Sequence, residues 1–206
     1  METRRGRLDK RQAVMAAAFS VFARDGYDQA RVEDIAAAAG VAKATVYNHF
    51  GDKETLFRQA ITDLSDAALT NNLRVIGLLD EAREDIAAAL RRVGLGLAEC
   101  YCADSSRALR RLLSSEPEQF SDLLGVVYDR VSRQVTRTLG DKLARLALAG
   151  RIRVDDPQLA AEQFTALLSG PIESRSRFGT RTIPRTELRG IARDAVSTFV
   201  KAFPTT

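Results

Sequence analysis

An all-α fold of about nine helices is what the sequence predicts. Apolar residues recur at helical spacing along most of the 206 residues. The alternation of apolar and polar residues that marks a half-buried strand is nearly absent, and β-branched residues are scattered. Residues 31–57 add a third observation, because they have the spacing of two short helices joined by a glycine turn and followed at once by a third helix.

The expected helices follow from apolar periodicity and from their start and stop signals. Val14, Ala18 and Phe22 share one face of the first helix, which Gly26 is expected to end. Gly94 and Gly96 each weaken a helix and indicate close packing or a bend. The helices after the first are expected at about 32–39, 43–49, 53–72, 83–103, 115–149, 157–170 and 185–203.

Two segments between these helices carry signals of their own. Ser115, Pro117 and Glu118 form a good helix start, because the serine can cap, the proline fits the first turn and the glutamate completes a capping box. Gly170–Pro184 has the Gly, Pro and Ser content of a loop.

Bulk properties exclude several classes of protein. The net charge of +4 permits an anionic partner without requiring one. The charged N-terminus is not a secretory signal, and no apolar run reaches the ~18 residues of a membrane span. Cys100 and Cys102 would point to different faces of a helix, so we expect buried thiols rather than a disulfide or a metal pair. A cytoplasmic protein with no cofactor is expected.

Residues 31–57 carry the chemistry of a DNA-reading motif. Ala36 lies where two helices cross closely, and Gly40 occupies a turn position that favours a positive φ. Val41 fills the core, and Val46 faces back toward Ile35. The second helix of such a motif fits the DNA major groove. Its exposed face would present Lys43, Ala44, Thr45, Tyr47, Asn48 and His49, residue types that contact phosphates and base edges.

The pattern AxxAGVxxxTVYxHFxxKxxLF, from Ala36 to Phe57, resembles the signature of the TetR family of ligand-responsive transcriptional repressors. The resemblance extends from about residue 10 to about residue 60. Beyond it the chain resembles the family in length and helical character, and the run from Arg110 through Gly150–Phe164 is similar to the regulatory domains of AcrR/AefR-type members. The resemblance implies a DNA-binding domain at residues 1–52 and a regulatory domain at 53–206.

Site roles carried over from the family are specific. Lys43 and Thr45 are placed to reach base edges or phosphates, and Tyr47 and His49 match positions that commonly bind phosphate oxygens. Lys53 matches a backbone clamp, aided by amides at the positive end of its helix. Arg31 could contact another phosphate. Many relatives carry Thr near positions 30 and 31, so Ala30 and Arg31 depart from the family pattern at this contact.

An N-terminal basic tail is open to two interpretations. It is either an arm for the minor groove or a solvated chain end. The tail consists of Arg4, Arg5, Arg7, Lys10 and Arg11.

The resemblance also implies a homodimer, formed through about 157–170 and 185–203, and a pocket for a small-molecule inducer. Apolar residues at helical spacing are also what a plain core shows, so a filled core is an alternative. The expected lining residues are Leu64, Leu97, Tyr101, Leu112, Phe120, Leu124, Tyr128 and Phe164.

The predicted function is that of a homodimeric repressor that binds a palindromic operator in double-stranded DNA and is released by an inducer. The alternatives are a helical protein-interaction module, or a DNA-binding activator without an inducer. An enzyme is disfavoured, because the chain has one histidine and no catalytic or metal-binding constellation. The operator, the regulated genes, the inducer and the sign of regulation are not encoded in any recognisable pattern.

Overall fold

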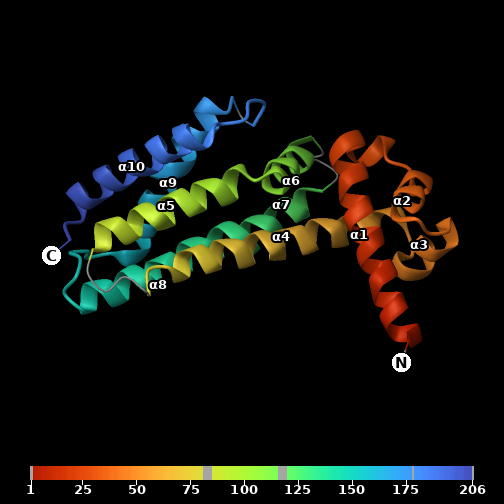
Figure 1. The fold of residues 1–206 in the computed structure, drawn as a ribbon, viewed down its shortest axis with the longest axis horizontal. Coiled ribbons are helices and arrows are strands. Elements are labelled where there is room, and N and C mark those ends of the chain that lie inside the picture. Colours follow the sequence, from red (N-terminus) through yellow and green to blue (C-terminus); the bar gives the residue numbers. More distant parts are fainter. Residues whose placement is uncertain (1, 81–84, 116–119, 178, 206) are drawn as a thin grey trace. The chain divides into compact units, whose positions relative to one another are not determined.

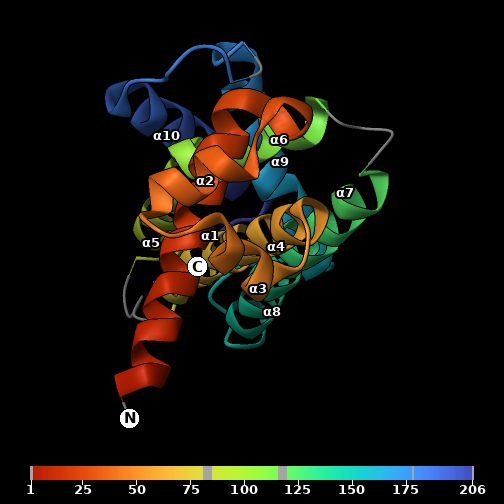
Figure 2. The same cartoon turned by 90° about the vertical axis from the view of Figure 1, so that its right-hand side faces the viewer.

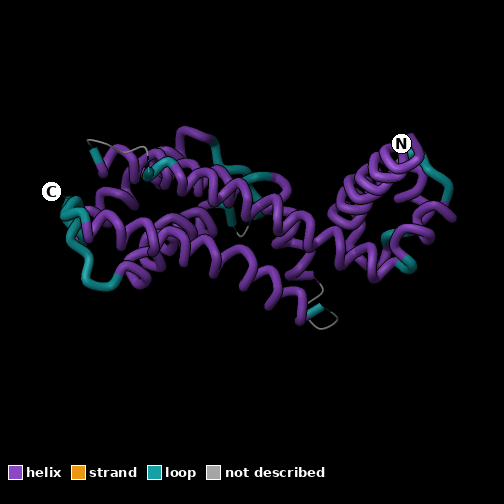
Figure 3. Tube along the Cα trace, turned by 90° about the horizontal axis from the view of Figure 1, so that it is seen from below, coloured by secondary structure: helices purple, strands orange, loops and turns teal. Residues whose placement is uncertain are grey.

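The computed structural model describes residues 2–80, 85–115, 120–177 and 179–205 (Figure 1). Within them the regular structure is helical, apart from one isolated bridge between Ile152 and Thr205 (Figure 3). Three elements, α7, the π-helix η1 and α8, follow one another without a break, so these described ranges contain nine helical segments. The all-α prediction is confirmed. None of the described helices is long and apolar enough to cross a membrane.

The helices begin and end close to the positions expected for most of the chain. They are α1 (Glu2–Gln29), α2 (Val32–Ala39), α3 (Lys43–Phe50), α4 (Lys53–Gly77), α5 (Ile86–Cys102), α6 (Asp104–Ser115), α7 (Ser121–Val127), η1 (Tyr128–Arg133), α8 (Gln134–Leu148), α9 (Pro157–Arg175) and α10 (Arg185–Ala202).

The chain divides into two compact units. The first unit comprises Met1–Ser65 and Ala108–Val127, and the second comprises Asp66–Arg107 and Tyr128–Thr206. The first unit thus contains more than the expected DNA-binding domain of residues 1–52, because it includes the first half of α4 and a segment from the middle of the chain. The division within α4 means that one continuous helix belongs to both units.

The first unit is built on α1, against which α2 and α3 pack (Figure 2). Its core combines residues from both segments of the unit. Phe22 and Phe57 of the N-terminal segment share one apolar cluster with Leu112 and Phe120 of the later segment. Burial of these large side chains holds the 108–127 segment to the helices of the N-terminal region.

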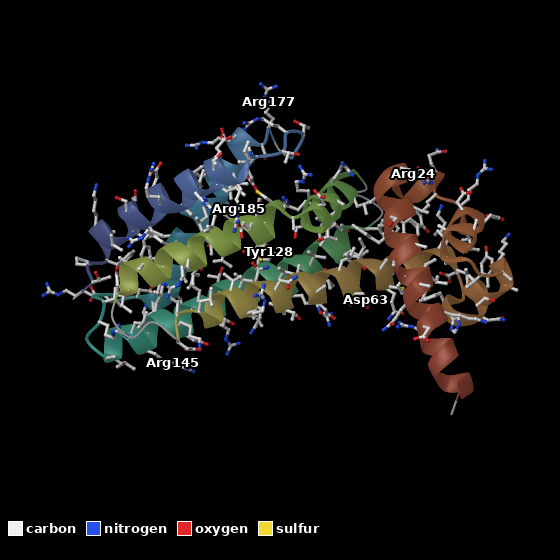
Figure 4. All side chains as sticks on the ribbon, viewed as in Figure 1. Arg24, Asp63, Tyr128, Arg145, Arg177 and Arg185 are labelled. Carbon is white, nitrogen blue, oxygen red and sulfur yellow. The ribbon has the colours of Figure 1, made fainter. Side chains whose placement is uncertain are left out.

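The second unit is a bundle in which α10 packs on α5 and α9, and α9 also packs on α8 (Figure 1). Its core includes Leu90, Leu139, Phe164 and Phe199. A Cβ atom built on Gly96 would lie 2.7 Å from Cγ1 of Val75, which confirms the expectation of close packing at this glycine. Side chains of the bundle surface project outward, among them Arg177 after the end of α9 (Figure 4).

Several expectations about the elements were wrong. The segment from Gly170 was expected to be a loop, but α9 continues to Arg175 with Pro171 inside it. Ile172 explains the continuation, because this residue is buried against α5 and α10 and its burial offsets the hydrogen bond that proline removes. The helix α6 was not expected at all.

The predicted helix start at residues 115–118 has a mixed outcome. Ser115 is the last residue of α6, and residues 116–119 lie outside the described part of the chain. The following helix begins at Ser121. The long α4 also exceeds its expected end and reaches Gly77, because Val75 and Ile76 are buried in the core of the second unit.

Candidate nucleic-acid interface

The turn between α2 and α3 has the geometry that its sequence predicts. Gly40 adopts φ 65° and ψ 33°, a left-handed conformation that glycine reaches without a steric penalty. Its amide donates to the carbonyls of Ala36 and Ala37, and the amide of Val41 donates to the carbonyl of Ala36 at 3.0 Å. This cap ends α2 and directs the chain into α3, which confirms the helix-turn-helix.

Buried side chains on one face of α3 fix which residues its other face exposes. Val46 and Phe50 lie in the core together with Ile35 of α2. Tyr47 is 41% exposed, although it is a large aromatic side chain. The remaining residues expected on the reading face are exposed or partly exposed: Lys43, Ala44, Thr45, Asn48 and His49.

The N-terminus of α3 has no side-chain cap. Its N-cap residue is Ala42, whose methyl group cannot accept a hydrogen bond from the first turn. Amides at the start of a helix, together with the positive end of its dipole, favour a phosphate at that position. The start of α3 therefore suits the DNA backbone as well as the bases.

Lys43 is paired within the chain, which the sequence did not reveal. Its ammonium nitrogen lies 2.5 Å from Oε1 of Glu33 on α2 and 5.6 Å from the ring centroid of Tyr47. Hydrogen bonding to Lys43 lowers the pKa of Glu33, and the same bond raises the pKa of Lys43. Arg31 is exposed at the N-cap position of α2, so it too lies on this side of the motif.

Lys53 is the first residue of α4 and is held by the end of α1. Its Nζ donates to the backbone carbonyl of Asp28 at 3.1 Å and lies 4.6 Å from the ring centroid of Tyr27. One of the first amides of α4, which the family resemblance assigns to the DNA backbone, is bonded within the chain. Oδ1 of Asp52 accepts from the Thr55 amide at 2.6 Å, and this bond lowers the pKa of Asp52. A carboxylate thus caps the Thr55 amide at the start of this helix.

The basic tail is helical in this structure and not a coil, because α1 begins at Glu2 and includes it. Arg11 packs against the motif, with its guanidinium carbon 5.6 Å from the ring centroid of Phe50 at the end of α3. Such a cation over an aromatic ring is attractive and positions α1 against the reading helix.

The residues expected to line a ligand pocket are divided between two cores. Leu112 and Phe120 lie in the core of the first unit beside Phe57. Leu97 and Phe164 lie in the core of the second unit. For these four residues apolar periodicity identified buried positions correctly, but it carries no information about which core each one joins.

The other four expected pocket residues are more exposed. Leu64 is partly buried, Leu124 is exposed, and Tyr128 is 60% exposed (Figure 4). Tyr101 is partly buried and its hydroxyl donates to Oε1 of Glu173 at 2.5 Å.

The apolar faces expected to form a dimer interface are buried within a single chain. Phe164 of α9 and Phe199 of α10 meet edge to face, with ring centroids 5.0 Å apart. A second copy could therefore reach only the outer faces of these helices. On α9 the outer face carries Leu159, which is 48% exposed, and the exposed residues Gln163 and Ala166.

Two family models match the chain in separate regions. Residues 14–60 match the bacterial regulatory proteins of the tetR family. Residues 88–205, more than half of the chain, match the C-terminal domain of AefR-like transcriptional repressors. The first match includes α2, α3 and the start of α4, which form the candidate interface.

Individual proteins show the same likeness. The nucleoid occlusion factor SlmA of Escherichia coli K12 is 26% identical over 164 residues, which are 76% of this chain and 78% of that protein. A solved structure assigned to the TetR-family transcriptional regulators of Mesorhizobium loti is 27% identical and has a TM-score of 0.87, covering 96% of this chain and 98% of that one. The flavonoid-responsive regulator FrrA is 25% identical, with a TM-score of 0.73 and coverage of 94% and 96%. The chain therefore belongs to the TetR family of DNA-binding transcriptional regulators, with a C-terminal domain of the AefR-like type.

Proposed function

We propose that this TetR-family regulator is a homodimeric repressor that binds a palindromic operator through α3 and is released by a small-molecule inducer. Regulators of this family act by binding DNA and not by catalysis. The observation that carries the proposal is the exposed face of α3, which presents Thr45, Tyr47 and Asn48 above the buried residues Val46 and Phe50. A rigid helix with polar side chains outward fits the DNA major groove.

The roles of these side chains differ by their chemistry. Thr45, near the start of α3, would contact base edges, whereas Tyr47 and His49 would donate to phosphate oxygens. Lys53 and Arg31 would add phosphate contacts on either side of the reading helix. Phosphate contacts fix the register of the protein, and base contacts discriminate between sequences.

Capture of mixed-sequence duplex DNA by the purified protein at ~0.15 M salt, followed by sequencing, tests this proposal. Enrichment of an inverted repeat is expected. Thr45→Ala should change the preferred base at particular positions, and Thr70→Ala, on an exposed part of α4 in the second unit, is the matched control that should not. A folded protein that enriches no sequence would contradict the proposal and favour a protein-interaction module.

A dimer follows from the same requirement for discrimination. One short helix contacts few base pairs, whereas two copies related by a two-fold axis read both halves of an inverted repeat. The outer face of α9 supports an interface, because Leu159 is exposed there and the small exposed residue Ala166 lies two turns further along the same face. Leu159→Glu should give a monomer in analytical ultracentrifugation, and Leu148→Glu, at the 90% exposed end of α8, should not. A dimer that survives Leu159→Glu would place the interface elsewhere.

Release by an inducer is a population shift. A ligand that prefers the chain's non-binding conformation by ~1–3 kcal/mol would weaken operator binding about 5- to 150-fold. FrrA is flavonoid-responsive by name, so a panel of flavonoids is the first set of ligands to titrate against the protein–operator complex. Dissociation of the complex is expected with one member. A flavonoid that binds the protein without changing operator affinity would contradict release, and an activator without an inducer would then be favoured.

A further inference from the structure

The Lys53 side chain is restrained on two sides although it is partly exposed. Its ammonium donates one hydrogen bond, to the carbonyl of Asp28 at 3.1 Å. The same ammonium lies 4.6 Å from the centroid of the Tyr27 ring, within the range of a cation–π interaction. An ammonium group has three donors, so the Asp28 bond leaves capacity for a phosphate.

The Tyr27 ring is itself fixed by three neighbouring aromatic rings. Its centroid lies 4.7 Å from that of Phe120 and 5.0 Å from that of Phe57, both edge to face, and 6.1 Å from that of Phe22 in a stacked arrangement. Phe22, Phe57 and Phe120 are each at most 1% exposed. A ring held in this way cannot turn away from the lysine without disturbing the core of the first unit.

The Tyr27 side chain is a neutral phenol at physiological pH, so its contact with Lys53 is a cation–π interaction. Burial raises the pKa of its hydroxyl, and the nearby carboxylates of Glu54, Asp52 and Asp28 raise it further. The neutral phenol presents an electron-rich ring face to the ammonium group. The carbonyl of Asp28 adds a second partially negative group on the same side.

We infer that Tyr27 is a positioning residue for DNA binding, because its ring and the Asp28 carbonyl hold the Lys53 ammonium in place before DNA arrives. The inference rests on the proposed phosphate contact of Lys53. A free lysine side chain loses rotamer entropy when it binds a phosphate. In this chain most of that loss occurs on folding, so less of it opposes binding.

A double-mutant cycle on duplex binding tests the inference. Phosphate contacts do not depend on sequence, so mixed-sequence duplex DNA at ~0.05–0.2 M salt is a sufficient probe. Lys53→Ala should weaken binding and reduce the slope of log K against log salt by about 0.9 per bound copy. Tyr27→Leu should weaken binding roughly 2- to 13-fold per bound copy, the equivalent of one immobilised side chain. In the Lys53→Ala background, Tyr27→Leu should have no effect.

Two controls separate positioning from loss of stability. Tyr27→Phe keeps the ring and should bind like the native protein. Phe22→Leu removes the most distant of the three rings around Tyr27 and leaves Phe57 and Phe120 against it, so it should lower the thermal unfolding temperature but leave the affinity of the folded protein unchanged. All titrations are made well below the unfolding temperature of each variant.

Nuclear magnetic resonance supplies a measurement that does not depend on DNA. Ring current from Tyr27 should shift the ε-methylene protons of Lys53 upfield in the native protein and in Tyr27→Phe, but not in Tyr27→Leu. An unshifted resonance in the native protein would overturn the inference, even if Tyr27→Leu fails to fold.

The two possible failures are distinguishable. If Lys53→Ala leaves affinity and salt slope unchanged, the phosphate contact of the proposed function is wrong. If Lys53→Ala weakens binding while Tyr27→Leu has no effect, or has the same effect with and without Lys53, then the contact stands and the positioning role of Tyr27 is refuted.

Discussion

Substitution by alanine should stabilise the protein at Gly94 but not at Gly96, although both glycines lie inside α5. Alanine favours a helix over glycine by up to ~1 kcal/mol. A Cβ on Gly94 would make ordinary contacts, 3.4 Å from Cζ of Phe164 and 3.5 Å from Cγ2 of Val196. We therefore expect Gly94→Ala to stabilise the protein by about 0.5–1 kcal/mol.

Gly96 has no such room. A Cβ there would lie 2.7 Å from Cγ1 and 3.0 Å from Cγ2 of Val75, and these atoms are close to the backbone of α4 and cannot swing away. Overpacking of this kind costs ~1–3 kcal/mol, which cancels or exceeds the gain in helix propensity. Gly96→Ala should thus be less stable than Gly94→Ala by about 1–3 kcal/mol.

Urea and thermal unfolding at one protein concentration measure this difference. For a chain of this length it corresponds to unfolding temperatures that differ by roughly 2–12 °C. Val75→Ala removes both crowding methyl groups, so the cost of Gly96→Ala should fall in that background. The packing argument would be refuted if the two alanine substitutions changed stability equally. It would also be refuted if Gly96→Ala destabilised the Val75→Ala variant as much as it destabilises the native protein.

Three further outcomes are expected. Phe120→Ala should lower the free energy of unfolding by about 3–5 kcal/mol in urea titrations, because the ring is buried against two aromatic neighbours, Tyr27 and Phe57; a loss below that of a surface substitution would contradict its place in the core. Asp52→Asn keeps a capping oxygen, so stability at neutral pH should persist. Since the folded pKa of Asp52 is below its ordinary 3.8, its stabilisation is complete above that pH and is lost as the pH falls through the folded value; urea midpoints from pH 2 to 7 should show this acid dependence in the native protein and less of it in the variant. Glu33→Gln should release Lys43, so duplex binding should tighten and its salt slope should steepen by up to about 0.9 per bound copy, whereas weaker binding would show that the pair supports the interface.

The sequence by itself determined the helix-turn-helix and its exposed face, because both depend on local rules. Gly40 is required by one left-handed turn position, and the spacing of Ile35 and Val46 decides which side of α3 is buried. Gly26 interrupts α1 near its end, because its backbone at φ 76° and ψ 175° is a conformation that glycine reaches readily and other residues rarely adopt. These features involve residues close together in the chain, where periodicity and capping carry the information.

The tertiary structure alone decided which buried face joins which core. Phe120 was expected to line a pocket and instead packs beside Phe57 and Tyr27, because an apolar stripe specifies burial but not its partner. The extension of α9 through Pro171 likewise depends on the burial of Ile172 by other helices.

The same limit applies to charged residues of the interface. The type and position of Lys53 suggested a phosphate contact, but its restraint by Tyr27 and the Asp28 carbonyl arises only when the end of α1 meets the start of α4. The pairing of Lys43 with Glu33 likewise depends on how α2 and α3 cross. Residue type determines what a side chain can bind, and the fold determines which partner is within reach, because contacts between helices are set by packing and not by spacing along the chain.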